Sequence, residues 1–188
     1  HRVDRRQRQM CIRDRSRDNR GFIVFINDEK KFVFVSVPKT GSTAINMCAM
    51  DSWAHPEPHL HHASIKEILE KFPHCQDYFK FAFVRNPWDK VVSAYFNGIQ
   101  DVGHIRQWSE GLHEYKNFEE FVMNMESSDW SEWTHFLPSS HFVKIDGQIA
   151  VDFVGRFENL EKDFQEVAST LGINGDLSLS LIHISEPT

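Results

Sequence analysis

Two short runs of almost purely apolar residues, each followed directly by a polar loop and a helical stretch, constrain the fold of this chain most strongly. They are FVFVSV at residues 32–37 and FKFAFV at residues 79–84. Strands that are apolar on both faces are typical of parallel sheets with helices packed on each side. The sequence therefore predicts an α/β fold, with a central parallel sheet and hairpins as antiparallel additions.

Turn residues and apolar periodicity predict the remaining elements. A hairpin is expected from residues 22–26 and the first run, around the polar turn 27–30. A second hairpin, from residues 142–145 and 149–154, is expected around Asp146-Gly147. Helices are expected at about 44–50; at 64–72, with a Ser64/Glu67 capping box; from Pro87, with Trp88, Val91, Val92 and Tyr95 on its apolar face; at 118–125 and 130–136; and at 160–171, ending at Gly172.

Length and charge bound the domain organisation. A chain of 188 residues is the size of one domain. Residues 1–20 carry eight Arg and three Asp, and MCIRDR within them, like SLSLIHISEPT at the other end, resembles translated sequencing adapter. We therefore expect residues 1–20 to be a disordered or non-native Arg-rich tail, residues 21–175 one domain, and residues 176–188 a non-native tail. A basic arm for RNA or anionic lipid is the alternative for the first segment.

Composition excludes several classes of protein. After residue 20 there are 13 basic and 24 acidic residues, a balance that argues against a nucleic-acid binder. No apolar run approaches the roughly 18 residues of a membrane-spanning helix, so a soluble chain is expected. The three cysteines, Cys11, Cys48 and Cys75, lack CxxC spacing and support neither a disulfide scaffold nor a zinc ribbon.

The loop after the first run has the features of an anion site. Residues 38–43, PKTGST, lead from a buried strand into a helix, where free backbone N–H groups and the helix dipole attract an anion. Gly41 allows a close backbone approach, Ser42 and Thr43 add hydroxyl donors, and Lys39 adds a positive charge. The Walker pattern GxxxxGK[ST] is absent. An ordinary capping serine beside a surface lysine is the alternative interpretation.

Arg85 and Ser93 form a second candidate anion site. Arg85 follows the second run, at the strand end where α/β folds bind ligands, and a guanidinium binds phosphate in a bidentate manner. Ser93 lies two turns into the next helix and can donate to the same anion. Alternatively, Arg85 is a structural ion-pair partner and Ser93 a solvated position. Together the two sites describe a ligand with two separated anionic groups.

These residues resemble one known family. VSVPKTGSTA is similar to the 5′-phosphosulfate loop of sulfotransferases that use 3′-phosphoadenosine 5′-phosphosulfate (PAPS), and FVRNPWDKVVSAYF to their 3′-phosphate motif. VDFVGRFENLEKDFQEVASTLGI resembles a late strand and helix of the carbohydrate branch, which includes Golgi-type and bacterial enzymes. The resemblance implies a three-layer fold like that of P-loop NTPases, and a domain at residues 21–175 that is truncated at its C-terminal end.

The resemblance also implies roles for the residues of both loops. Lys39 and the backbone N–H groups of Thr40, Gly41, Ser42, Thr43 and Ala44 would hold the 5′-phosphosulfate, and Arg85 and Ser93 the 3′-phosphate. Lys39 would also be catalytic, because charge on the bridging oxygen grows during in-line transfer. No acidic pair near the loop is suited to magnesium, so no metal is expected to be required.

The acceptor hydroxyl needs a base, and a histidine-rich segment lies between the two motifs. His62 in HHAS resembles the family's HAT/HAS element and is the expected catalytic base or positioning residue, with His61 and Glu57 behind it. Adventitious zinc binding and a plain loop are the alternatives.

A second acceptor-facing loop is expected between His135 and His141, although Ser139-Ser140 stand where relatives often have Gln. Aromatic residues near it have two possible roles: Trp108, Trp130 and Trp133 could stack on a sugar or belong to the core. Arg156 and Glu158 are expected to form a structural pair or a helix cap.

The sequence thus predicts a PAPS-dependent sulfotransferase that acts on a hydroxyl, most readily that of a carbohydrate. A P-loop-type kinase and a non-catalytic nucleotide- or glycan-binding fragment are the alternatives. The resemblance implies a Golgi lumenal domain in a eukaryote and a cytoplasmic enzyme in a bacterium. The sequence does not specify the acceptor or the oligomeric state.

Overall fold

The computed structural model of the chain describes residues 23–48, 54–56, 62–100 and 110–177. Its strands are β1 (Ile23–Asn27), β2 (Phe32–Val35), β3 (Ala54–Pro56), β4 (Phe79–Val84), β5 (Lys144–Ile145), β6 (Gln148–Ile149) and β7 (Phe153–Arg156). Its α-helices are α2 (Ser42–Cys48), α3 (Ile65–Lys71), α4 (Pro87–Gly98), α6 (Phe118–Met125), α7 (Ser139–Val143) and α8 (Leu160–Leu171). Short 3-10 helices are η2 (Pro73–Cys75), η3 (Glu110–Glu114), η4 (Asp129–Glu132) and η5 (Phe157–Asn159).

Five strands form one mixed sheet in the order β3-β1-β2-β4-β7. The two apolar runs, β2 and β4, are parallel neighbours, and β7 pairs with β4 in the same direction. β1 is antiparallel to both β2 and β3. The predicted parallel sheet and its antiparallel addition through the first hairpin are therefore confirmed for the described residues.

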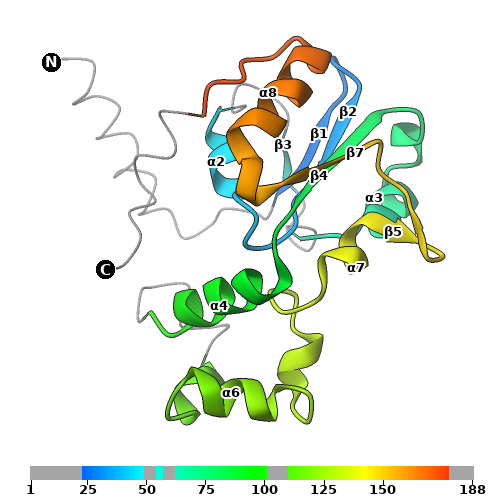
Figure 1. Ribbon diagram of the computed structural model, residues 1–188. Coiled ribbons are helices and arrows are strands. Elements are labelled where there is room, and N and C mark those ends of the chain that lie inside the picture. Colours follow the sequence, from blue (N-terminus) through cyan, green and yellow to red (C-terminus); the bar gives the residue numbers. More distant parts are fainter. Residues whose placement is uncertain (1–22, 49–53, 57–61, 101–109, 178–188) are drawn as a thin grey trace, which may run out of the picture.

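Helices cover both faces of this sheet (Figure 1). Successive strand residues point to opposite faces, and the two faces have separate cores. Phe32 and Phe34 pack with residues of α2 and α8, whereas Val33 and Val35 pack with residues of α3 and α7. The result is the helix–sheet–helix layering that the sequence predicts.

Local signals set the ends of two of the covering helices. Ser64 caps α3, since its hydroxyl accepts a hydrogen bond from the Glu67 N–H at 3.3 Å and its own N–H donates to Glu67 Oε2 at 2.7 Å. At the end of α8, Gly172 adopts φ of 60°, a left-handed conformation that glycine adopts without strain. The predicted capping box and the predicted helix end are both confirmed.

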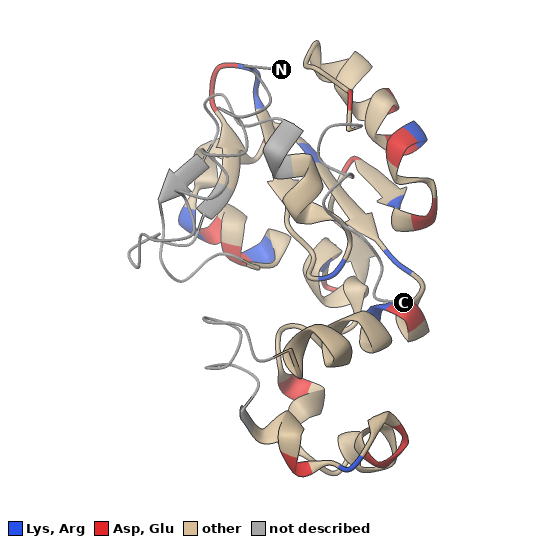
Figure 2. Cartoon of the chain, turned by 90° about the vertical axis from the view of Figure 1, so that its left-hand side faces the viewer, with Lys and Arg blue, Asp and Glu red and all other residues tan. Residues whose placement is uncertain are grey.

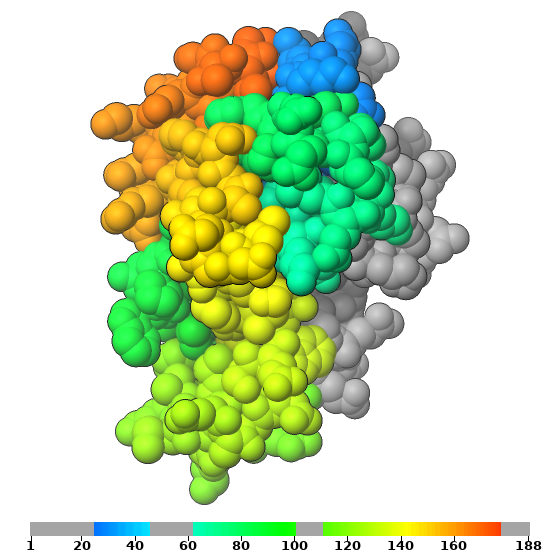
Figure 3. Space-filling view, turned by 90° about the vertical axis from the view of Figure 1, so that its right-hand side faces the viewer, coloured from blue at the N-terminus to red at the C-terminus, as the bar shows by residue number. Residues whose placement is uncertain are grey.

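A small helical lobe lies beyond the carboxyl ends of β2 and β4 and contains α4 and α6 (Figure 1). Its core is a separate aromatic cluster centred on Tyr95 and Phe121, whose rings lie 5.0 Å apart. Residues around 135–150 run along one side of the molecule, between this lobe and the region of α3 (Figure 3). The lobe thereby closes the edge of the sheet at which the two predicted anion sites lie.

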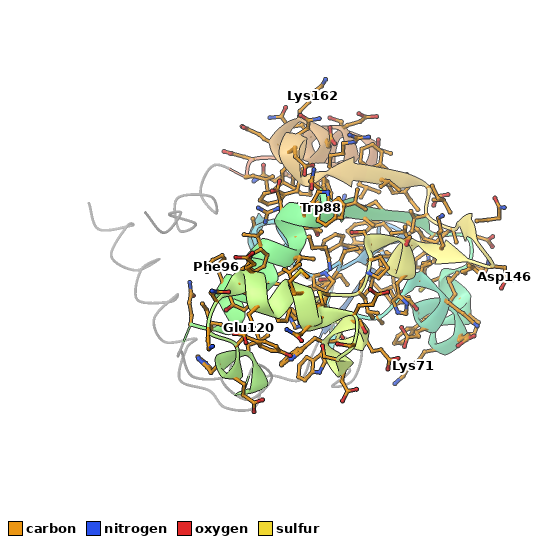
Figure 4. The ribbon with its side chains drawn as sticks, turned by 60° about the horizontal axis from the view of Figure 1, so that its bottom comes forward. Lys71, Trp88, Phe96, Glu120, Asp146 and Lys162 are labelled. Atoms are coloured by element: carbon orange, nitrogen blue, oxygen red, sulfur yellow. The ribbon has the colours of Figure 1, made fainter. Side chains whose placement is uncertain are left out.

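The predicted apolar face of α4 is wrong in part. Trp88 is 74% exposed and Val92 is also exposed, whereas Lys90 and Tyr95 are buried. Figure 4 shows Trp88 and Phe96 as side chains of this helix. The physical reason is that α4 packs against the lobe cluster through Tyr95 and turns Lys90 toward the backbone carbonyls of His135 and Leu137, so the apolar period alone did not identify all of its inner face.

The second predicted hairpin is also shorter than expected. Its turn is present, with positive φ at Asp146 (50°) and Gly147 (81°), as a two-residue turn of the primed type requires. Each strand of the hairpin has only two residues; Phe142 belongs to α7, and residues 153–156 form β7 of the main sheet. Phe142 and Val143 are buried against α3, and this packing outweighs the β preference of the run. Similarly, the helix predicted at 130–136 is only the short η4.

The predicted tails lie largely outside the described residues. Residues 1–20 are not described, and of residues 176–188 only Asp176 and Leu177 are. Leu177 is fully buried in the same cluster as Phe25 and Phe164. Among the described helices, no helix combines the length and apolarity that crossing a membrane requires.

Candidate active site

The loop between β2 and α2 is a tight turn with two residues in the left-handed region. Lys39 has φ of 65° and Gly41 has φ of 81°. The Thr40 side chain is fully buried and its hydroxyl donates to the Val37 carbonyl at 2.9 Å, so this hydroxyl braces the loop from inside. The N–H of Ala44 donates to the Gly41 carbonyl at 2.9 Å and is therefore already used. At the start of α2, Ser42 is half-buried and Thr43 is exposed.

Gly41 is needed for close packing as well as for its backbone conformation. A Cβ at this position would lie 2.8 Å from Leu160 Cδ2 and 3.3 Å from Phe157 Cδ2. The sequence reasoning expected Gly41 to admit a ligand; the structure places η5 and the start of α8 against it. Phe157 of η5 and Leu160 of α8 therefore pack directly against the Lys39 loop.

The Lys39 ammonium is partly buried and held by the lobe. Its Nζ donates to Asn97 Oδ1 on α4 at 2.8 Å. Burial and, to a smaller extent, the nearby Arg85 charge lower the pKa of Lys39 from 10.5 to about 8. Lys39 is thus a cation in a site that disfavours its charge until an anion is present.

Arg85 follows β4 and reaches the Lys39 loop, as the parallel pairing of β2 and β4 predicts. Its Nη1 donates to the Lys39 carbonyl at 3.4 Å, and its guanidinium carbon lies 4.2 Å from the centre of the Phe157 ring. Its Nε is buried and has no hydrogen-bond partner among the described residues. A buried donor without a partner is costly, so this guanidinium has unused capacity to bind an anion.

The start of α4 is fixed by two side-chain caps. Asn86 Oδ1 accepts from the Trp88 N–H at 3.0 Å, and Glu158 Oε1 accepts from the Asn86 N–H at 2.6 Å. This second bond is the main reason that the pKa of Glu158 is lowered. Glu158 therefore acts as a backbone cap, one of the two expected roles. The Arg156 N–H donates to Asp163 at 2.7 Å.

Lys90 is a buried cation that the sequence reasoning did not single out. It is 2% exposed, and its Nζ donates to the carbonyls of His135 and Leu137, each at 2.8 Å. Burial lowers its pKa to about 8, with a smaller contribution from the Lys39 charge. Lys90 thus ties α4 to the segment before α7 and adds a third positive charge near the loop. Figure 2 shows basic segments where the sheet meets the region of α4.

His62 lies beside the start of the same loop. Its Nδ1 is 2.8 Å from the carbonyl of Ser36, the residue directly after β2. Because a carbonyl only accepts, Nδ1 carries the proton and Nε2 is the ring's acceptor. The His135 ring packs edge-on against it, with centroids 5.3 Å apart. His61 and Glu57 lie outside the described residues.

The other predicted residues that the structure describes lie on α4, in the lobe and on α7. Ser93 is half-buried on α4, one turn before Asn97, and its hydroxyl forms no hydrogen bond with a described residue. Trp130 and Trp133 pack with each other in the lobe, with ring centroids 5.0 Å apart, and Trp108 lies outside the described residues. His141 is exposed on α7.

Two further residues beside the loop were missed. Asn97 contacts Lys39, and Phe157 contacts Arg85. Asn97 could have been identified from its position four residues after Ser93, because this spacing puts both on one face of a helix. Phe157 has no comparable sequence signal.

One group of potential metal ligands lies at the other end of the sheet. Asp28, His74 and Cys75 bring their ligand atoms within 4.8 Å of one another, just before the start of β4. Asp28 Oδ1 also accepts from the Tyr78 hydroxyl at 2.9 Å, and His74 Nε2 lies 3.2 Å from the same oxygen. These contacts tie the β1–β2 turn to the residues that lead into β4. They lie at the opposite end of β4 from Arg85.

Comparison with known proteins gives consistent relatives. An uncharacterized protein of Archaeoglobus fulgidus is 30% identical over 104 residues, which cover 55% of this chain and 76% of that protein. Carbohydrate sulfotransferase 9 of Homo sapiens is 23% identical over 185 residues, covering 82% of this chain and 42% of the relative. Carbohydrate sulfotransferase 14 of Mus musculus is 30% identical over 107 residues, which cover 49% of this chain and 28% of the relative. The matches thus span less than half the length of either named sulfotransferase, and no solved structure matches the chain.

The sequence model of the sulfotransferase family covers most of the chain. It matches residues 23–186, which include β1, the Lys39 loop, Arg85 and the whole helical lobe. In the structure, β2, the Lys39 loop, α2 and β4 follow one another in the order that the two sequence motifs predict. The chain belongs to the sulfotransferase family.

Proposed function

We propose that this chain binds PAPS between the Lys39 loop and Arg85 and transfers its sulfuryl group to a hydroxyl of a carbohydrate. One observation carries the proposal: the guanidinium of Arg85 lies against the Lys39 loop, 3.4 Å from the Lys39 carbonyl. Two cations from the ends of two adjacent parallel strands then face one site. Such a pair suits a ligand with anionic groups at both ends.

The charges of the site fit a polyanionic nucleotide. Among the described residues, no carboxylate forms an ion pair with Lys39, Arg85 or Lys90. Partly buried cations without a counterion are destabilised, as the lowered pKa values of both lysines indicate. The buried Arg85 Nε, which has no partner among the described residues, is a further donor for a phosphate oxygen. A bound anion would compensate all of these charges together.

The family resemblance supplies the residues that would hold PAPS. Lys39 and the N–H groups of residues 40–43 would bind the 5′-phosphosulfate, and Arg85 and Ser93 the 3′-phosphate. PAPS, when bound, supplies the activated sulfuryl group. Lys39 places its positive charge where negative charge develops in the transition state, so it lowers the barrier rather than only improving binding.

His62 is suited to remove the proton of the acceptor. Its Nδ1–H donates to the Ser36 carbonyl, which fixes the tautomer in which Nε2 is the basic nitrogen. The ring lies beside the Lys39 loop, on the side of His135. His62 would thus take the proton of the attacking hydroxyl at Nε2 while Lys39 stabilises the leaving group.

The carbohydrate acceptor is supported by the relatives. Two named relatives are carbohydrate sulfotransferases, 9 and 14, at 23% and 30% identity. The proposal of a sugar hydroxyl therefore rests on similarity to these proteins, whereas the donor site rests on the contacts of Lys39 and Arg85.

The test is transfer of labelled sulfate from PAPS to a panel of unsulfated polysaccharides and small alcohols. We expect label in at least one polysaccharide with the wild-type chain and none above background with Lys39→Met. Binding of adenosine 3′,5′-bisphosphate (PAP) without any transfer would favour a non-catalytic binding fragment. Phosphate transfer from ATP, without sulfate transfer, would favour the kinase alternative.

A further inference from the structure

We propose that Asn97 is a positioning residue for Lys39: its side-chain carbonyl holds the lysine ammonium at the mouth of the loop between β2 and α2. The inference rests on the proposed donor site and adds a residue to it. Lys39 Nζ donates to Asn97 Oδ1 at 2.8 Å, although the residues are 58 positions apart in the chain. No other hydrogen bond of this ammonium is recorded within the described part of the chain.

The backbone of Lys39 makes this contact directional. Its φ of 65° is a conformation that residues other than glycine adopt rarely. The side chain therefore leaves the loop in a direction set by the turn, toward α4. Asn97 is half-buried in the last two turns of that helix, whose start is capped by Asn86 and Glu158. A rigid helix thus presents the amide oxygen to a lysine on a constrained loop.

The neutral amide is chemically suited to this task. The charge of Arg85 acts on Lys39, and the charge of Lys39 acts on Lys90. Both of these neighbours of Lys39 are cations. Glu158 acts on Arg85, but its carboxylate is bonded to the Asn86 N–H. His62 contacts the loop at Ser36, through its ring nitrogen. A carboxylate at position 97 would neutralise Lys39, whereas an amide orients the ammonium and leaves its charge for an incoming anion.

The position of Asn97 relative to Ser93 extends the argument. The two residues are four apart on α4, so they share one face of the helix. The face that is expected to contact the 3′-phosphate through Ser93 therefore also holds Lys39 through Asn97. One helix would then align the cation of the first loop with the second anion site.

The experiment measures the pKa of the Lys39 amine directly, by ¹³C/¹⁵N NMR titration of lysine side chains in the full chain. Lys39→Met assigns the resonance, because its signal disappears in that variant. In Asn97→Asp the pKa of Lys39 is expected to rise by at least one unit, a tenfold gain in proton affinity. In Asn97→Leu it is expected to fall, because the ammonium loses its acceptor. Asn124→Asp, on the exposed side of α6, is the matched control and should leave Lys39 unchanged.

The second measurement is the affinity for PAPS, by calorimetry on the same proteins. Each Asn97 variant is expected to bind PAPS about 10- to 100-fold more weakly than the wild type, the range for losing one charge-assisted contact. Asn124→Asp should bind like the wild type. A thermal melt of each variant establishes that it is folded under the conditions of both measurements.

The outcomes separate this inference from the proposed function. An unchanged Lys39 pKa in folded Asn97→Asp, or wild-type PAPS affinity in both Asn97 variants, overturns the role of Asn97. Failure of the wild-type chain to bind PAPS contradicts the proposed function itself, and with it the role of Asn97 toward the donor. In that case the NMR titration still decides whether Asn97 holds the ammonium.

Discussion

At the scale of a single residue, the lowered pKa of Lys39 predicts how the reaction depends on pH. The value of about 8 refers to the free protein, and kcat/KM for PAPS reports groups of the free protein. On the alkaline side, we expect kcat/KM to fall about tenfold per unit above about pH 8, as the ammonium loses its proton. A pH–rate profile of the wild-type chain measures this decline.

In Lys39→Arg the rate will be lower, but the alkaline decline should be missing, because a guanidinium stays charged. An unchanged decline in that variant would assign it to another group, such as Lys90.

Gly41 gives a second prediction at the residue scale. Gly41→Ala adds a Cβ 2.8 Å from Leu160 Cδ2 at a residue with φ of 81°. Backbone strain of about 1–2 kcal/mol and overpacking of about 1–3 kcal/mol should together lower the free energy of unfolding by about 2–5 kcal/mol. Gly147→Ala is the control, since it has the same φ but no atom within 4 Å of its Cβ. Chemical denaturation should show a loss of only about 1–2 kcal/mol there; equal losses in both variants would refute the packing argument.

At the scale of an element, Lys90 determines how α4 is attached to the rest of the molecule. Lys90→Met removes the donor to the carbonyls of His135 and Leu137, and each of these partly buried carbonyls left without a partner costs up to about 1–3 kcal/mol. The pKa of Lys90 in the folded chain, about 8, lies below its ordinary 10.5, so the unfolded chain binds more protons between these values. Stability attributable to Lys90 therefore rises with pH over that interval.

The measurement is urea denaturation of the wild type and Lys90→Met at several pH values. Relative to the variant, the wild type should gain up to about 2 kcal/mol between about pH 8 and pH 10. Lys66→Met, an exposed lysine on α3, serves as the control and should show no such gain. A difference between wild type and Lys90→Met that is constant with pH would contradict the burial-lowered pKa.

Most elements could be predicted from the sequence because their signals are local. β2 and β4 were predicted from runs that are apolar on both faces, α3 from its capping box, and the end of α8 from Gly172. The inner face of α4 could be predicted only in part: Val91 and Tyr95 lie on it, but it also includes Lys90, whose partners are backbone carbonyls 45 and 47 residues away. Residues 142–143 were predicted as strand and are helical for the same reason: a distant partner, α3, decides their conformation.

At the scale of the whole molecule, the site is a consequence of topology. Parallel pairing of β2 with β4 places the residues that follow them at one edge of the sheet, so the proximity of Lys39 and Arg85 could be predicted from the order of elements. The contributions of Asn97, Lys90 and Phe157 could not, because they depend on how the lobe and η5 pack onto that edge. The fold thus determines where the two cations meet, and tertiary packing determines how each cation is held.

Because the site joins the sheet to the lobe, a ligand that bridges Lys39 and Arg85 should stabilise the whole chain. PAP at 100 times its Kd should add about 2.7 kcal/mol to the free energy of unfolding, which for this length raises Tm by about 5–10 °C. Adenosine 5′-diphosphate, which lacks the 3′-phosphate, should have a clearly smaller effect at equal concentration. In Arg85→Met the difference between the two nucleotides should become much smaller, since the cation assigned to the 3′-phosphate is gone. A thermal-shift titration with PAP, adenosine 5′-diphosphate and ATP tests all of this; a larger shift with ATP than with PAP would contradict the assignment of Arg85 to the 3′-phosphate.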